Sequence, residues 1–118
     1  MKNINEVLNN LNEFCSPRVL SSVDDHYVKI ARVIGELPMH KHVSDELFII
    51  HKGTMVMEIE GELIDLVEGD VFLVEAGRMH RPIAKEECQC ILVEKKEVKH
   101  TGNETFEITK SIEDQLKE

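Results

Sequence analysis

The sequence predicts an all-β domain with a short helix at its N-terminus. From residue 18 onward the chain consists of short runs rich in Val and Ile, separated by closely and regularly spaced turn signals, which is typical of a sandwich or barrel. Before that point the apolar residues recur with the period of a helix. With 118 residues, the chain can form one domain around one core.

The N-terminal segment has one apolar helical face, formed by Ile4, Val7, Leu8 and Leu11. Their spacing predicts an amphipathic helix over residues 3–14. Pro17 prevents that helix from continuing, because a proline inside a helix lacks the N–H that the helix needs. We expect residues 1–17 to be a helix and lead-in that covers a face of the following domain or contacts a partner subunit.

The strands follow in close succession. We expect them at residues 18–22, 27–34, 46–51, 54–60, 62–67, 70–75, 80–84 and 88–95, with one more around Phe106 and Ile108. Turn signals separate them, including Gly35, Gly53, Gly61, Gly69 and Gly77. The predicted barrel domain therefore covers residues 18–110, and residues 111–118 form a polar tail.

Composition excludes several classes of partner. The formal charge of −9 repels phosphate backbones, and no basic cluster with interleaved aromatic residues occurs, so we expect no nucleic-acid partner. The start "MKNINEVLNN" lacks the apolar core of a secretory signal, and no apolar run is long enough to span a membrane. Three cysteines without disulfide-scaffold spacing suit a reducing compartment. These features predict a cytoplasmic protein without membrane contact.

Cys88 and Cys90 share a strand face and could bind a soft metal as a CxC pair. Nothing nearby in the sequence completes a thiolate site. We therefore interpret both as small apolar residues in or near the core.

The stretch "MHKHVSDELF" brings chemistry-bearing residues together. In extended chain, side chains two apart point to the same face, so His40 and His42 project side by side. Glu46 begins a strand in which Phe48 and Ile50 occupy the same face, so a carboxylate heads an otherwise apolar inward row. This arrangement delivers ionisable groups to a dry interior.

His80 is a second polar outlier, because it opens a strand whose same-face residues Pro82 and Ala84 are uncharged. A buried carboxylate and three imidazoles without partners would each cost about 1–3 kcal/mol or more, whereas one divalent metal satisfies them together. A single inward histidine is more often a hydrogen-bonded core residue, but four such residues together favour a metal site. The remaining histidines have unsuitable parity or polar surroundings; they are His26, His51 and His100.

Two segments resemble the motifs of the cupin family. "GELPMHKHVSDELFIIHKG" is similar to the first motif, with its residues at Gly35, His40, His42, Glu46 and Gly53. "GDVFLVEAGRMH" is similar to the second motif, with its residues at Gly69, Gly77 and His80. Departures occur around the ligands: four residues instead of five separate Gly35 from His40, Glu75 replaces a proline, and Ala84 replaces a common asparagine.

This resemblance implies a small single-domain cupin, a jelly-roll barrel with one divalent metal held by His40, His42, Glu46 and His80. Nitrogen and carboxylate ligands suit Fe, Mn, Ni, Co, Cu or Zn, so the ion's identity stays open. Small cupins of this kind are often homodimers. The alternation of the strands further places four apolar residues on inward faces, where they would line a ligand pocket or pack the core; they are Phe48, Ile50, Met55 and Met57.

Two classes of function remain. One is a metal-dependent enzyme that acts on a small polar substrate by oxygenation, isomerisation or lyase chemistry. The other is a non-catalytic module that binds a small molecule or a metal, with a closed or purely apolar cavity. We expect no inward Arg, Lys or Tyr to bind an anion, and Arg81 should point away from His80, which disfavours sugar-phosphate isomerisation. An interaction protein without metal would require the ligand pattern to arise by chance.

Overall fold

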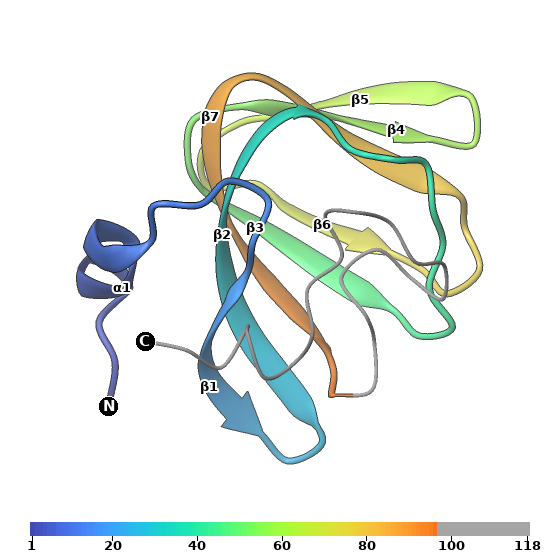
Figure 1. Ribbon diagram of the computed structural model, residues 1–118. Helices are drawn as coiled ribbons and strands as arrows, with labels where there is room; N and C mark the ends of the chain where they lie inside the picture. The colour runs from blue at the N-terminus through green and yellow to red at the C-terminus, as the bar shows by residue number, and fades with distance from the viewer. Residues whose placement is uncertain (97–118) are drawn as a thin grey trace.

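The computed structural model describes residues 1–96, which form one short helix and a seven-stranded antiparallel sheet curled into a barrel (Figure 1). The elements are α1 Ile4–Asn10, β1 Arg18–Val23, β2 His26–Glu36, β3 Glu46–Lys52, β4 Met55–Ile59, β5 Glu62–Leu66, β6 Val71–Val74 and β7 His80–Lys95. The predicted all-β jelly-roll fold with an N-terminal helix is confirmed. The strand expected near Phe106 and Ile108, the barrel limit at residue 110 and the tail at 111–118 lie outside the described residues.

Helix α1 is shorter than the predicted range of 3–14. Asn3 caps its start, since the side-chain oxygen accepts hydrogen bonds from the backbone N–H groups of Asn5 and Glu6. The helix ends because Leu11 adopts extended backbone and the Arg32 side chain donates to the carbonyl oxygens of Leu8 and Leu11, at 2.5 and 2.8 Å. A contact from the sheet, which the helical period does not contain, therefore sets the end of α1.

Strand β7 organises the barrel. The sequence predicted separate strands at 80–84 and 88–95, but the structure joins them into one strand of 16 residues. Its first part pairs with β4, its later part pairs with β3, and β2 pairs with both parts across a register shift between Val33 and Gly35. The acidic residues between the predicted strands stay extended because this pairing supplies the hydrogen bonds that their own propensity does not favour.

The barrel interior follows the two-residue period of its strands. In β4, Met55, Met57 and Ile59 are buried, while Glu58 points outward and pairs with Arg81. Cys88 and Cys90 are fully buried in the same core, as expected for small apolar side chains. No helix within residues 1–96 has the length and apolar character needed to cross a bilayer.

Gly53, a motif glycine, closes the tight turn between β3 and β4. Its φ of +88° is a conformation that side-chain-bearing residues rarely adopt. A Cβ atom added there would lie 2.9 Å from the carbonyl oxygen of Glu87 on β7. The turn therefore requires glycine both for its backbone conformation and for the close approach of β7.

Candidate metal site

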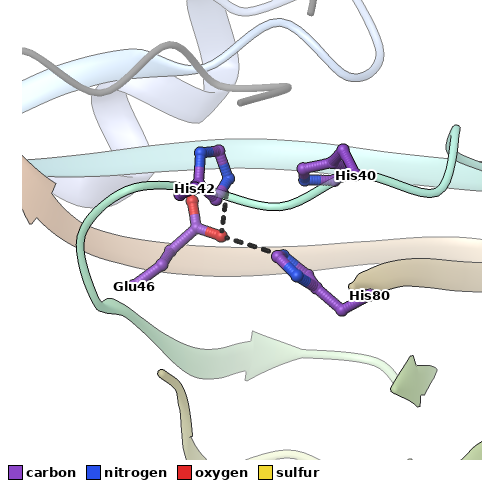
Figure 2. A group of neighbouring side chains, drawn as sticks. All are labelled: His40, His42, Glu46 and His80. Atoms are coloured by element: carbon purple, nitrogen blue, oxygen red, sulfur yellow. Dashed lines mark ion pairs between the residues drawn. The ribbon is translucent and has the colours of Figure 1, made fainter. Parts of the chain in front are cut away.

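Three imidazoles and one carboxylate meet inside the barrel (Figure 2). His40 and His42 come from the segment between β2 and β3, Glu46 is the first residue of β3, and His80 is the first residue of β7. One potential ligand atom from each lies within 4.8 Å of those of the others, and all four side chains are buried. Histidines far apart in the sequence thus share one small volume with a carboxylate.

Backbone pairing aligns the two ends of the site. His40 and His80 form an antiparallel bridge, in which each N–H donates to the other's carbonyl oxygen at 2.9 and 2.8 Å. The Gly77 N–H donates to the carbonyl oxygen of His42 at 2.8 Å. These bonds attach the irregular segment that carries His40 and His42 to the turn that precedes His80.

Backbone carbonyls orient two of the imidazole rings. Nδ1 of His40 lies 2.7 Å from the carbonyl oxygen of Pro38, and Nδ1 of His80 lies 2.8 Å from that of Arg78. Because a carbonyl oxygen can only accept, each Nδ1 is the donor of this contact, which leaves Nε2 as the ring atom available to a metal. This is the usual support of a metal-binding histidine.

The inner atoms of the cluster lack hydrogen-bond partners among residues 1–96. They are both ring nitrogens of His42, Nε2 of His80 and Oε1 of Glu46. The nearest contacts are from Glu46 Oε1 to His42 Nε2 at 3.4 Å and to His80 Nε2 at 3.5 Å, drawn as dashed lines in Figure 2. Buried polar atoms without partners are costly, and a cation among these nitrogen and oxygen donors would satisfy them at once. The residues present therefore fit a metal ion.

The cluster also favours the protonation states that ligands need. Burial lowers the pKa of His40 to about 4, despite the opposing hydrogen bond to Pro38, so its ring is neutral near pH 7. Burial alone would raise the pKa of Glu46, but the adjacent imidazoles of His42 and His80 outweigh it and hold that pKa well below its ordinary value. A neutral His40 and an anionic Glu46 can bind a cation without first releasing protons.

An apolar cavity adjoins the site on the side of His40 and Glu46, with a volume of about 30 Å³. Of the predicted pocket residues, Phe48 contributes to its wall, whereas three lie in the surrounding core and not in this wall: Ile50, Met55 and Met57. Cys15 and Pro17 of the N-terminal lead-in also line it, which the sequence did not indicate. Cavity walls that come from a distant segment leave no local sequence signal.

The sequence did not indicate that a lysine is buried inside the barrel. Lys29 on β2 is fully buried, and its Nζ lies 2.6 Å from Oε1 of the equally buried Glu94 on β7. Residues two apart in a strand share a face, so Lys29 lies on the same face as the buried Ala31 and Val33. This spacing could have predicted that Lys29 is buried. The lysine does not line the cavity. Arg81 points away from the site, as expected, and pairs with Glu58.

Comparisons with known proteins agree with this architecture. The family model of the cupin domain matches residues 32–94. The uncharacterized protein YdbB of Bacillus subtilis is 34% identical over 83 residues, which are 69% of this chain and 74% of that protein.

Solved structures show the same fold. The crystal structure of a cupin-2 domain containing protein from Shewanella frigidimarina superposes with a TM-score of 0.78 and 33% identity, over 81% of this chain and 95% of that one. The hydroquinone 1,2-dioxygenase PnpCD, solved with Cd²⁺ and 4-hydroxybenzonitrile, superposes with a TM-score of 0.71 and 19% identity, over 81% of this chain and 72% of that one. The family match covers more than half of the chain and contains all four residues of the cluster, and this chain is therefore a member of the cupin domain family.

Proposed function

We propose that this cupin binds one divalent first-row metal ion through His40, His42, Glu46 and His80 and uses it on a small molecule. The observation that carries the proposal is a set of buried ligand atoms within 4.8 Å of one another whose inner members have no other partner among residues 1–96. When bound, such an ion supplies a Lewis acid that can accept a further oxygen or nitrogen donor.

The protein's own groups would hold that donor set in place. The Pro38 and Arg78 carbonyls orient two imidazoles, and Glu46 supplies the one negative charge among the four ligands. The buried surroundings exclude water and so strengthen the interaction between the carboxylate and a cation. Oxygenation, isomerisation and lyase chemistry are all compatible with such a site.

A second candidate is a non-catalytic module that binds a metal or a small molecule. The observation that favours it is the small and almost entirely apolar cavity, in which, among residues 1–96, His40 and Glu46 are the only ionisable groups besides the thiols of Cys15 and Cys90. A catalytic site for a polar substrate would normally supply further polar groups to position it. The enzyme and the binding module share the metal site and differ in whether the bound molecule is converted.

Compartment and assembly belong to the same proposal. Cys15, Cys88 and Cys90 are free thiols, which supports a cytoplasmic, reducing environment. We further propose that the chain forms a homodimer and that its ligand is a small molecule, with no nucleic acid or membrane as partner. The acidic net charge of −9 supports the exclusion of nucleic acid.

Elemental analysis of protein purified without chelator tests the metal site. We expect about one equivalent of Fe, Mn, Co, Ni, Cu or Zn in the parent and its loss in the His40→Ala/His80→Ala variant. The matched control is His26→Ala/His51→Ala, which removes the same number of histidines outside the cluster and should retain the metal. A folded parent that contains no metal and takes up none of these ions would refute the proposal.

Assays for turnover then separate the two candidates. If the parent contains iron, it is tested for oxygen consumption with small organic substrates. If it contains another metal, it is tested for isomerase and lyase activity. Conversion that disappears in His40→Ala/His80→Ala supports the enzyme. Saturable binding of the same molecules without any conversion supports the module.

A further inference from the structure

The cavity beside the metal site has walls of two origins. Phe48, Pro82 and Leu92 come from the barrel interior, and Cys15 and Pro17 come from the N-terminal lead-in. The lead-in precedes the family match, which begins at residue 32. The cavity therefore combines a wall from outside the residues that the family model matches with a metal-binding end that lies inside them.

Several hydrogen bonds hold this N-terminal wall in place. The Cys15 N–H donates to the carbonyl oxygen of Arg32 at 2.6 Å, and the Arg32 side chain in turn donates to the carbonyl oxygens of Leu8 and Leu11. Arg32 also pairs with Glu87 on β7. The Cys15 thiol donates to the carbonyl oxygen of Ile34 at 3.6 Å, which directs the sulfur toward the sheet.

Cys15 adopts a conformation that usually belongs to glycine, with a φ of +55°. A residue with a side chain persists in this region only when its surroundings compensate for the strain. Here the side chain packs against the core cluster and contributes to the cavity wall. Replacement of Cys15 by glycine would relax the backbone and enlarge the cavity.

The chemistry of the cavity restricts what it can accept. At one end Oε1 of Glu46 is buried and lacks a hydrogen-bond partner among the described residues. The walls that residues 1–96 supply are otherwise apolar, apart from His40, and include neither Lys nor Arg. A charged group on the far side of a ligand would lose its hydration without gaining a partner, at a cost of several kcal/mol. The volume of about 30 Å³ leaves room for only about one or two carbon atoms beyond the metal-binding end.

We propose that the ligand of this site is a small molecule with an oxygen-donor end and a short, uncharged apolar body, and that Cys15 limits the size of that body. This inference rests on the proposed metal site. Under this inference, the polarity of the small polar substrate expected from the sequence belongs only at the metal-binding end. Cys15 acts as a specificity-determining wall and takes no part in chemistry.

Binding of hydroxamates to the Co²⁺-loaded protein, followed by the visible spectrum of the metal, tests this inference without any turnover. Hydroxamates share one oxygen-donor end and differ in their bodies, so acetohydroxamate, benzohydroxamate and succinic monohydroxamate offer a methyl group, a phenyl ring and a carboxylate. We expect acetohydroxamate to bind the parent about tenfold or more tightly than either of the others, since pocket fit discriminates by roughly this factor.

Variants at position 15 then test the wall. Cys15→Gly should strengthen benzohydroxamate binding about tenfold, while the affinities for acetohydroxamate and for the carboxylate-bearing probe stay nearly unchanged. Cys15→Ser keeps the side-chain volume and should retain the parent's selectivity. Cys15→Ala supplies a second enlarged cavity if the glycine variant does not fold, and it should shift selectivity in the same direction.

The outcomes separate the two proposals. Failure of Co²⁺ to bind, visible before any hydroxamate is added, would overturn both the metal site and this inference. Co²⁺ binding with no hydroxamate binding, with equal affinities for all three probes, or with selectivity unchanged in Cys15→Gly and Cys15→Ala would overturn the inference alone. The inference is supported if the parent prefers acetohydroxamate to both larger probes and the Cys15→Gly and Cys15→Ala variants accept benzohydroxamate but still reject the carboxylate-bearing probe. The ligand class is then a small molecule with an oxygen-donor end and a short, uncharged apolar body.

Discussion

Two groups of ionisable side chains lie buried in the same barrel, and they differ in whether they neutralise themselves. Lys29 and Glu94 bring opposite charges to within 2.6 Å. The cluster of His40, His42, Glu46 and His80 contains one carboxylate and three rings, with inner atoms that lack hydrogen bonds among residues 1–96. The first group contains its own positive charge beside the carboxylate, whereas in the second group an added cation would satisfy the unpaired nitrogen and oxygen atoms. This difference distinguishes a structural pair from a candidate binding site.

The two groups are also neighbours. Glu94 and Glu46 are directly paired on β7 and β3. Burial, together with the negative charge of Glu46, raises the pKa of Glu94, and the Lys29 ammonium opposes that rise. The 2.6 Å contact between Lys29 Nζ and Glu94 Oε1 is an ion pair between two fully buried side chains. Lys29 therefore offsets the repulsion between two carboxylates that the sheet register places side by side.

The largest effect is expected from removal of the lysine. Lys29→Met leaves Glu94 buried without a counter-charge beside Glu46, and loss of one partner of a buried pair typically costs about 3–5 kcal/mol of unfolding free energy. Urea denaturation of the metal-free protein measures this. The double variant Lys29→Met/Glu94→Leu should recover most of the loss, because both charges are then absent. A single variant as stable as the parent would show that the pair has no such role.

Acidification should destabilise the metal-free protein through the cluster. In the folded state the pKa of His40 is about 4, below its ordinary value of 6.5, so between these pH values the unfolded chain binds the extra proton. The unfolding free energy therefore falls as the pH decreases from 6.5 to 4, by about 3 kcal/mol from His40. Below pH 4.5 the lowered pKa of Glu46 adds a further loss.

Urea denaturation at a series of pH values measures this slope. His40→Phe should remove most of the decrease between pH 6.5 and 4, whereas His26→Ala, at a half-buried position outside the cluster, should leave it intact. If the unfolding free energy of the parent stays constant between pH 6.5 and 4, the pKa of His40 is not lowered in the folded protein.

The smallest effect is expected at His42, both of whose ring nitrogens lack hydrogen bonds among the described residues. Removal of a buried polar side chain that makes no hydrogen bond can be neutral or stabilising, and the variant also loses the 3.4 Å contact between His42 Nε2 and Glu46 Oε1. His42→Leu should therefore change the stability of the metal-free protein by about 1 kcal/mol or less. The same variant should lose affinity for the metal. Thermal denaturation with and without added Co²⁺ measures both, and a loss above about 2 kcal/mol without metal would place His42 with Lys29 as a structural residue.

The sequence and the structure agree best where one local rule decides the outcome. Strand alternation was sufficient to predict the inward row of Met55, Met57 and Ile59 and the outward direction of Arg81. The same rule applied to β2 would have placed Lys29 on the inward face. Because lysines are so seldom buried, the residue type argued against the position that the alternation gives. The end of α1 could not be predicted, because Arg32 lies more than twenty residues away along the chain.

By itself the sequence determined the family, the strand periodicity and the residues of the candidate metal site, because extended chain converts the spacing of His40, His42 and Glu46 into a common direction. Only the tertiary structure decided that β7 is continuous, that Lys29 meets Glu94, and that Cys15 lines the cavity beside Glu46. Each of these features depends on contacts between segments distant in the chain. Periodicity within one segment carries no information about which distant segment packs against it.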